Sequence, residues 1–326
     1  MRDENEFISS FEGTYIDLIE DELYLVVNTV KDSKVDELLA LPQINSYKDF
    51  LHFEKANNSI SQIYLNFGEI IHITQSMRPQ GVIVYIDMSI NNNVLYILHS
   101  EIDNTEFINA VEPFNPSIIY EDPPPAPQNI IQSQLNDDFN SVELRILGGD
   151  GLYNNETESI CSVGFWTRDK YNQNELYIIT AGHCMDEENV QKYNFFFMNH
   201  GILRYPNAHI LDQLIISDGV PVYSHGVHMC KSGSTSHFTC GHVLGLNGIY
   251  SSREGIAYEL IITDMSAETG DSGGSVISFV SPQDLNLVAA HGIHILRGAC
   301  AQPIDTIFRV IKENTERELT LYQRGS

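Results

Sequence analysis

The stretch Glu268-Thr-Gly-Asp-Ser-Gly-Gly-Ser275 decides how the rest of this 326-residue chain is interpreted. It places Ser272 between an aspartate and two glycines, with Gly270 two residues earlier. Small residues leave the backbone uncrowded, so the N–H groups of Gly270 and Ser272 can converge on one bound carbonyl oxygen. The same residue types also favour a surface turn. The stretch is therefore either a turn or a nucleophile loop, and a nucleophilic serine needs a base elsewhere in the chain.

The segment Thr180-Ala-Gly-His-Cys184 supplies a candidate base. It follows the apolar run Leu176-Tyr-Ile-Ile179, which predicts a strand, so His183 would emerge at the strand's end and be able to reach another element. The neighbouring Cys184 can be tethered to Cys161, which would hold the turn in place. A lone histidine is usually structural or solvated, but one held in this way upstream of a serine loop is better explained as a general base.

Composition restricts the partners that are open to the chain. It has 18 Lys+Arg against 44 Asp+Glu, a formal net charge of −26, which argues against nucleic-acid partners and against docking on anionic membranes. No apolar run approaches the ~20 residues that span a bilayer. The start, Met1 to Phe7, is acidic and lacks the apolar core of a secretory signal, so export would need a signal outside this chain or another route.

A proline-rich segment, Glu121-Asp-Pro-Pro-Pro-Ala-Pro-Gln128, forms the clearest boundary in the sequence. Consecutive prolines can join neither a helix nor a sheet interior, and they favour an extended spacer. We expect a linker over residues 121–141. Before it, residues 1–120 predict a small α+β unit, with β-hairpins at Tyr15–Val27 and Val82–Leu98.

Residues 142–326 predict an all-β body closed by a C-terminal helix. Short strands alternate there with turn signals, as in a sandwich or barrel. Ile304, Ile307 and Ile311 share one face of a helical pattern near the end.

Four segments of this body resemble a known family. Cys161-Ser-Val-Gly-Phe165, Thr180–Cys184, Cys230-Lys-Ser-Gly-Ser-Thr-Ser-His-Phe-Thr-Cys-Gly241 and Gly270-Asp-Ser-Gly-Gly274 occur in the order and approximate spacing of the α-lytic protease/streptogrisin group. The resemblance spans residues 142–312 and implies the chymotrypsin fold, two six-stranded β-barrels with the active site between them. It implies a secreted, monomeric serine endopeptidase that acts on polypeptides and needs no metal or cofactor.

The unit of residues 1–120 is more weakly similar to that group's pro-region, through Val84-Tyr-Ile-Asp87 and Asn93-Val-Leu-Tyr96. In the family the pro-region assists folding and blocks the active site until it is removed. The resemblance therefore implies that this chain is a zymogen, with its own pro-region as a partner.

The resemblance also implies a Ser-His-Asp triad, and two aspartates compete for the third place. Asp212 precedes Leu214 and Ile216, so it would open an alternating strand, which is the family's setting. Asp218 precedes Gly219 and reads better as a turn. We assign Asp212. Ser272 would then attack a peptide carbonyl to form an acyl-enzyme, with His183 as base and the amides of Gly270 and Ser272 as oxyanion hole.

The five cysteines are assigned through the same resemblance, which implies disulfides Cys161–Cys184 and Cys230–Cys240 and leaves Cys300 without a partner. It also implies an ion pair between Lys231 and Asp271. The competing interpretation is a four-ligand zinc site, built from cysteines and histidines at positions 225, 228, 230, 237, 240 and 242. Their spacing fits no standard zinc finger, so we expect no metal.

Specificity is predicted from the segment after Gly292. By the resemblance, His294 falls on the wall of the pocket for the side chain before the scissile bond, where some family members that cut after glutamate have a histidine. Ser266 would add a polar contact. The other interpretation makes His294 a strand residue that faces the core.

One departure from the family bears on activity. Ile295 stands where the family usually has a serine that supports the catalytic aspartate, which puts the support of Asp212 in question. The alternative function is a catalytically silent, protease-like binding protein, against which an intact triad argues.

Overall fold

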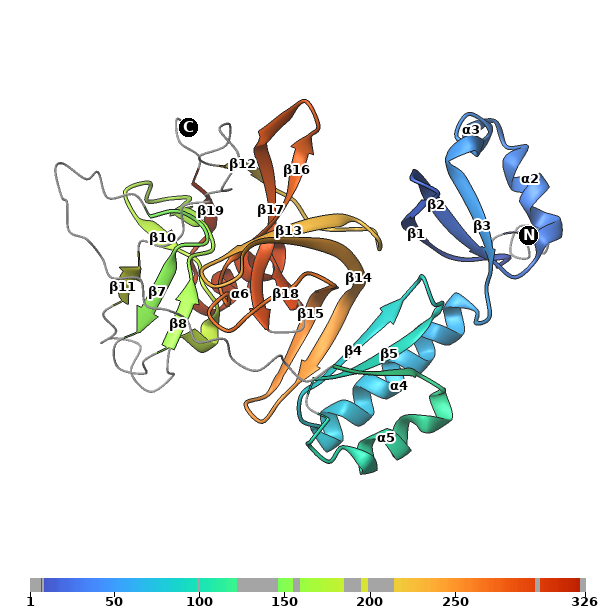
Figure 1. The fold of residues 1–326 in the computed structure, drawn as a ribbon, viewed down its shortest axis with the longest axis horizontal. Coiled ribbons are helices and arrows are strands. Elements are labelled where there is room, and N and C mark those ends of the chain that lie inside the picture. Colours follow the sequence, from blue (N-terminus) through green and yellow to red (C-terminus); the bar gives the residue numbers. More distant parts are fainter. Residues whose placement is uncertain are drawn as a thin grey trace.

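The computed structural model describes residues 7, 9–98, 100–121, 146–154, 159–184, 195–198, 214–296 and 300–322. Asp212 and nearly all of the predicted linker fall outside these residues. The described chain is mainly β-structure with a helix near its C-terminus, as predicted (Figure 1). Among the described residues, no helix is long and apolar enough to span a membrane.

The chain begins with a three-stranded sheet of order β1-β2-β3. Strands β1 (Phe11–Ile19) and β2 (Glu22–Thr29) form the first predicted hairpin, and β3 (Leu51–Lys55) pairs with β2 in parallel. Between β2 and β3 lie four short helical elements: η1 (Asp32–Lys34), α2 (Val35–Leu39), α3 (Pro42–Asn45) and η2 (Lys48–Phe50).

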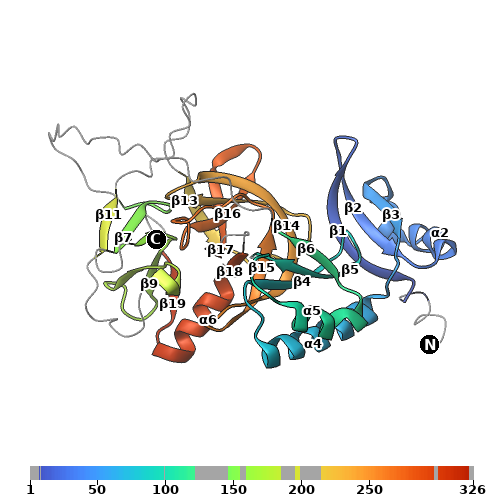
Figure 2. The same cartoon turned by 60° about the horizontal axis from the view of Figure 1, so that its bottom comes forward.

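A second α+β layer follows. Its sheet contains the second predicted hairpin, β4 (Val82–Asp87) with β5 (Asn92–Ile97), and the parallel strand β6 (Ser117–Tyr120). Helices α4 (Ile60–Met77), α5 (Thr105–Val111) and η3 (Glu112–Phe114) complete the layer. Figures 1 and 2 show α4 and α5 on one side of β4 and β5. We did not predict α4, although Ile63, Phe67 and Ile70 recur at helical spacing and bury one face against β4 and β5.

The C-terminal half contains a closed six-stranded barrel. Its strand order is β13-β16-β17-β18-β15-β14, and pairing of β13 with β14 closes the ring. The strands are β13 (His228–Gly233), β14 (His237–Ser251), β15 (Ile256–Thr263), β16 (Ser275–Ser281), β17 (Asp284–Leu296) and β18 (Cys300–Pro303). Buried apolar side chains fill it, among them Met229, Val243 and Val276. This barrel matches the second of the two that we predicted.

The other half of the all-β body consists, in the described residues, of two three-stranded sheets. One has the order β11-β7-β8 and the other β10-β9-β19, so a six-stranded ring like the predicted first barrel is not formed by these strands alone. Their bounds are β7 (Gly151–Asn154), β8 (Ser159–Ser162), β9 (Trp166–Asp169), β10 (Leu176–Ile178), β11 (Phe195–Met198) and β19 (Leu319–Leu321).

Helix α6 (Ile304–Thr315) is the predicted C-terminal helix. Its Ile304 and Ile307 pack in one cluster with Phe165 and Ile293, so the helix joins the two halves of the body. Strand β12 (Ile215–Gly219) makes a further connection by pairing in parallel with β17.

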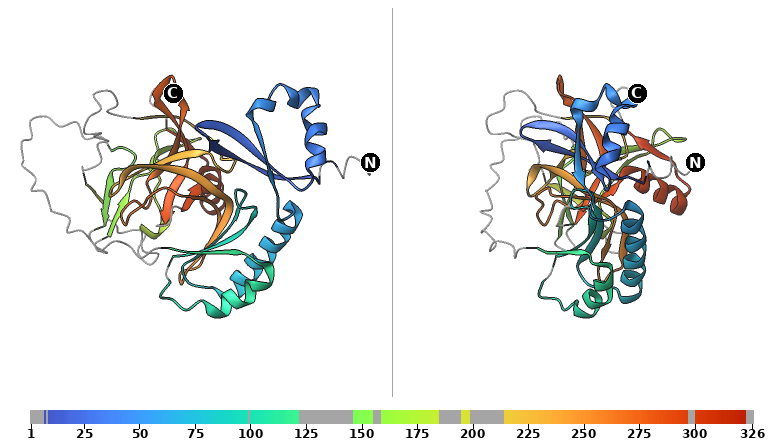
Figure 3. Two further views of the ribbon diagram at one scale, coloured as in Figure 1. Left: turned by 45° about the vertical axis from the view of Figure 1, so that its right-hand side comes forward. Right: turned by 90° about the vertical axis from the view of Figure 1, so that its right-hand side faces the viewer.

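The N-terminal unit is attached to the C-terminal barrel by backbone pairing. Strand β4 pairs with the long strand β14, with Val82 opposite Ser251, and this joins β4, β5 and β6 to the barrel's sheet. A second contact lies at β1, where the Ile16 amide donates to the carbonyl of His225 at 2.9 Å. Figure 3 shows β4 and β5 beside the barrel. These contacts bring residues 80–82 to the edge of the site described next.

Candidate active site

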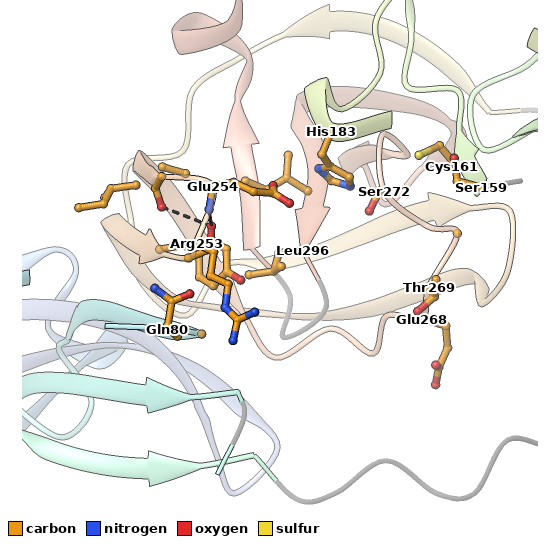
Figure 4. Close-up of a pocket in the computed structure, with 18 of the residues that line it drawn as sticks. Gln80, Ser159, Cys161, His183, Arg253, Glu254, Glu268, Thr269, Ser272 and Leu296 are labelled. Atoms are coloured by element: carbon orange, nitrogen blue, oxygen red, sulfur yellow. Dashed lines mark hydrogen bonds between the residues drawn. The ribbon is translucent and has the colours of Figure 1, made fainter. Parts of the chain in front are cut away.

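A pocket of about 760 Å³ contains both His183 and Ser272. Its walls come from β8, the 3₁₀ turn η4 (Gly182–Cys184), the tip of the β14–β15 hairpin, the Ser272 loop and the end of β17. Gln80, Gly81 and Ile102 of the N-terminal unit also line it. Figure 4 shows His183 and Ser272 close together on one side, with Arg253 and Glu254 across from them. The fold thus brings the two central residues of the sequence hypothesis into one cavity.

His183 lies in the 3₁₀ turn η4 (Gly182–Cys184), just after β10, where we expected it. The turn is held by the disulfide Cys161–Cys184 and by Thr180, whose hydroxyl donates to the carbonyl of Ser162 at 2.8 Å. Desolvation by the pocket lowers the pKa of His183 below its ordinary value, and the negative charge of Glu254 opposes this shift. A lowered pKa keeps the imidazole neutral, as a general base requires.

The loop that carries Ser272 is anchored by a buried ion pair. Asp271 and Lys231 have fully buried side chains, and Lys231 Nζ lies 2.8 Å from the Asp271 carboxylate. The carboxylate also accepts from the Ser236 hydroxyl at 2.5 Å and from the amides of Thr235, Ser236 and Glu268 at 2.8–3.0 Å. Burial by itself would raise the pKa of Asp271, but these donors lower it to about 2. The predicted Lys231–Asp271 pair is confirmed.

Two glycines let this loop pass close to its neighbours. Gly270 and Gly273 have φ of +105° and +92°, a region that side chains disfavour. A Cβ on Gly273 would lie 2.4 Å from the backbone oxygen of Ser162, and one on Gly270 would lie 2.2 Å from the Thr235 hydroxyl. The two glycines are therefore required by the loop's backbone geometry.

The backbone amides around Ser272 differ in whether they have a hydrogen-bond acceptor. Asp271 donates its amide to the carbonyl of Glu268 at 3.1 Å, and Gly273 donates to His294 at 2.7 Å. Within the described part of the chain, no acceptor is assigned to the amide of Gly270 or of Ser272. These two N–H groups are the ones that we predicted as the oxyanion hole, and an empty donor pair beside a serine hydroxyl suits that role.

His294 and Ser266, the predicted specificity residues, are not among the residues that line this pocket. His294 is 1% exposed, and burial together with the Lys231 ammonium lowers the pKa of its imidazole to about 3. Its backbone braces the Ser272 loop, because its amide donates to Gly274 at 2.8 Å. Ser266 is exposed and lines a separate cavity of about 330 Å³ next to Tyr85 and Tyr96. Their role in specificity stays a prediction.

The structure contains both expected disulfides, and Cys300 is free and buried. Disulfide sulfurs are not thiolate ligands, so the Cys230–Cys240 bridge takes two donors away from the zinc interpretation. Ile295, for which the resemblance predicted a change from the usual serine, is among the residues that line the pocket. Asp212 lies outside the described residues.

Two pocket residues, Arg253 and Glu254, were not identified from the sequence. They occupy the turn between β14 and β15 and reach the pocket because that hairpin folds toward the Ser272 loop. A charged pair within Ser-Ser-Arg-Glu-Gly255 looks like an ordinary exposed turn. Only the tertiary arrangement gives it significance.

Comparison with known proteins finds curated serine proteases with similar sequences. Serine protease 2 of Streptomyces fradiae is 29% identical over 157 residues, which cover 41% of this chain and 88% of that protein. Streptogrisin-A of Streptomyces griseus is 30% identical over 151 residues, 41% of this chain and 48% of that protein. No family model matches the chain.

Solved structures with similar folds include Thermobifida fusca protease A, with a TM-score of 0.39 and 20% identity over 54% of this chain and 99% of that one. A Nocardiopsis protease has a TM-score of 0.39 and 23% identity over 55% of this chain and 99% of that one. With these sequence relatives, the fold is that of a chymotrypsin-like serine protease, a hydrolase. In sequence the chain is similar to Streptomyces serine proteases, a streptogrisin among them.

Proposed function

We propose that the chain is a serine endopeptidase that cleaves polypeptides through an acyl-enzyme, with Ser272, His183 and Asp212 as its triad. The observation that carries this proposal is the single pocket that holds both His183 and the glycine-framed Ser272. Ser272 attacks the substrate carbonyl while His183 takes its proton. His183 then donates this proton to the leaving amine, and a water molecule repeats the sequence to release the acyl group. Asp212 orients the imidazole and stabilises its charged form.

The amides of Gly270 and Ser272 stabilise the oxygen of the tetrahedral intermediate. The directions of the two amides are fixed before the substrate arrives. The buried ion pair with Lys231 holds Asp271, which is the residue between Gly270 and Ser272. Donors fixed in advance need no reorganisation as charge develops, which is the main source of their catalytic effect.

Residues 1–120 serve as the pro-region in this proposal, and the chain is a secreted, monomeric precursor. Gln80, Gly81 and Ile102 occupy part of the pocket wall, and the Gly81 amide donates to Ser251 at 2.9 Å. Release of the unit, after a cut between residues 122 and 147, would widen access to Ser272. The disulfides suit an oxidising compartment outside the cytoplasm.

Labelling with a fluorophosphonate, followed by mass spectrometry, tests the nucleophile. We expect the adduct on Ser272, and Ser272→Ala should lower the turnover of a peptide substrate by about 10⁵–10⁶-fold. Ser281→Ala, at the opposite end of β16, is the matched control and should retain activity. Labelling at another serine, or a Ser272→Ala variant with activity within about tenfold of the original, would contradict the assignment.

A further inference from the structure

We propose that Arg253 forms a subsite for an acidic side chain of the polypeptide, on the pocket wall across from Ser272. The inference rests on the proposed function, because it requires a peptide in the pocket. To the residues of the proposed function it adds Arg253, which would select substrates by the charge of one side chain.

The turn that presents Arg253 is fixed by its own hydrogen bonds. The Ser252 amide donates to the carbonyl of Gly255 at 2.9 Å, and the Glu254 amide donates to the Ser252 hydroxyl at 3.2 Å. Strands β14 and β15 pair on either side of the turn, down to Ser251 and Ile256. The backbone at Arg253 is therefore held in place before a ligand arrives, which lowers the entropic cost of binding.

Arg253 differs from the other arginines described after residue 146. Arg309 pairs with Glu259, Arg317 pairs with Glu175, and Arg168 stacks on the ring of Tyr322. Within the described residues, no carboxylate lies within ion-pair distance of the Arg253 guanidinium, and no aromatic ring is assigned to it. In a chain with 44 acidic and 18 basic residues, an unpaired guanidinium in the catalytic pocket is unexpected. Its donors are available to a ligand.

The charges of the pocket are separated in space. Glu268 stands by the Ser272 loop, whereas Arg253 projects from the hairpin, and Figure 4 shows them on different sides of the cavity. Leu296, at the end of β17, lies between them on the pocket wall. An extended peptide with its scissile bond at Ser272 can pass Leu296 and reach Arg253 with a side chain a few residues away.

The chemistry of the group determines which side chain it selects. A guanidinium offers a planar fork of N–H donors that matches a carboxylate in two parallel hydrogen bonds. The neighbouring Glu254 lies toward His183, and its negative charge raises the pKa of that imidazole. Arg253 supplies the positive charge on this wall of the pocket. We therefore expect Asp or Glu at one substrate position near the scissile bond on the hairpin side.

The test uses the full-length chain and any product that it forms by cleaving itself. Fluorogenic peptides would carry Glu, Gln or Lys in turn at each of four positions before the scissile bond and two after it. We expect one position at which Glu exceeds Gln by about tenfold in kcat/KM, the size of a charge-assisted hydrogen bond. Arg253→Gln should abolish that preference, and Arg253→Glu should shift it toward Lys. The readout is the ratio of kcat/KM for Glu and Gln peptides within each variant, so a general change in turnover that affects both peptides cancels.

The matched control is Arg317→Gln, which removes the same charge from an exposed position away from the pocket. It should leave the preference unchanged. A Glu preference that persists in Arg253→Gln, or no Glu preference at any position, would overturn the inference while cleavage of the neutral peptides still supports the protease. Absence of both cleavage and fluorophosphonate labelling would instead refute the proposed function, and the inference with it.

Discussion

The loop that carries Ser272 and the turn that carries His183 face the same pocket but are built differently. The loop is fixed by a fully buried ion pair, five donors to one carboxylate, and two glycines at positive φ. In the described part of the chain, the turn is held by one disulfide and by the hydroxyl of Thr180. The loop is thus held by more buried polar contacts than the turn is.

This difference follows from what each element must do. An oxyanion hole works only when two amides point at one place, and amides have no side-chain freedom with which to correct an error. A histidine can adjust its ring by rotating χ1 and χ2. We therefore expect the loop to depend on buried electrostatics and the turn to depend on a covalent link.

Lys231→Met should produce the largest effect, because it leaves the Asp271 carboxylate buried without its counter-ion. Breaking a buried pair from one side costs about 3–5 kcal/mol of unfolding free energy, and the oxyanion amides should lose their directions with it. Denaturant unfolding and peptide hydrolysis measure the two effects. The double variant Lys231→Met/Asp271→Asn has no buried charge and should recover much of the stability. Equal stability of Lys231→Met and the parent protein would show that the pair does not anchor the loop.

The same pair predicts a dependence of stability on pH. The pKa of Asp271 is lowered from 3.8 to about 2 in the folded protein, so the unfolded state takes up the proton first. The contribution of Asp271 is complete above pH 4 and is lost as the pH falls toward 2. In Lys231→Met this acid-side loss should disappear from a series of unfolding curves. Its persistence would assign the acid sensitivity to other carboxylates.

Removing each disulfide should have an intermediate effect, and comparing the two removals separates an effect on stability from an effect on activity. Replacing Cys161 and Cys184 with serine should cost about 3 kcal/mol in unfolding free energy, and replacing Cys230 and Cys240 should cost a similar amount. Only the first bridge adjoins His183, so only its loss should also lower kcat. Equal loss of kcat in both double variants would mean that the first bridge acts through global stability and not by holding the turn.

The Ser272 loop could be predicted from sequence because its determinants are local. The glycines, the aspartate and the serine lie within five residues, and each has a defined steric or chemical reason to be there. The C-terminal helix and both N-terminal hairpins were also predictable, since their periodic patterns match their elements. The Lys231–Asp271 pair needed the family resemblance, because forty residues of sequence separate its members.

The features that sequence did not reveal depend on long-range contacts. Pairing of β4 with β14 joins segments more than 160 residues apart in the sequence. No local sequence pattern specifies which strand edge will pair with which other edge. The low pKa of His294 has the same long-range origin, since burial and the charge of Lys231 both contribute to it. Helix α4 is the exception, since its buried residues recur at helical spacing in the sequence. Arg253 and Glu254 gain their meaning only when their hairpin meets the pocket.

The smallest expected effect concerns the charge environment of His183. Glu254 raises the pKa of that imidazole, against the desolvation that lowers it. Glu254→Gln removes the negative charge and keeps the shape, so the pKa of His183 should fall further. The acid limb of the kcat/KM profile reports the base that must be neutral, and it should therefore move to lower pH. Glu268→Gln, on the far wall of the same pocket, is the matched control and should leave the acid limb in place. An acid limb that stays fixed in Glu254→Gln, or moves to higher pH, would show that Glu254 does not act on the base, and that this wall of the pocket influences only substrate binding.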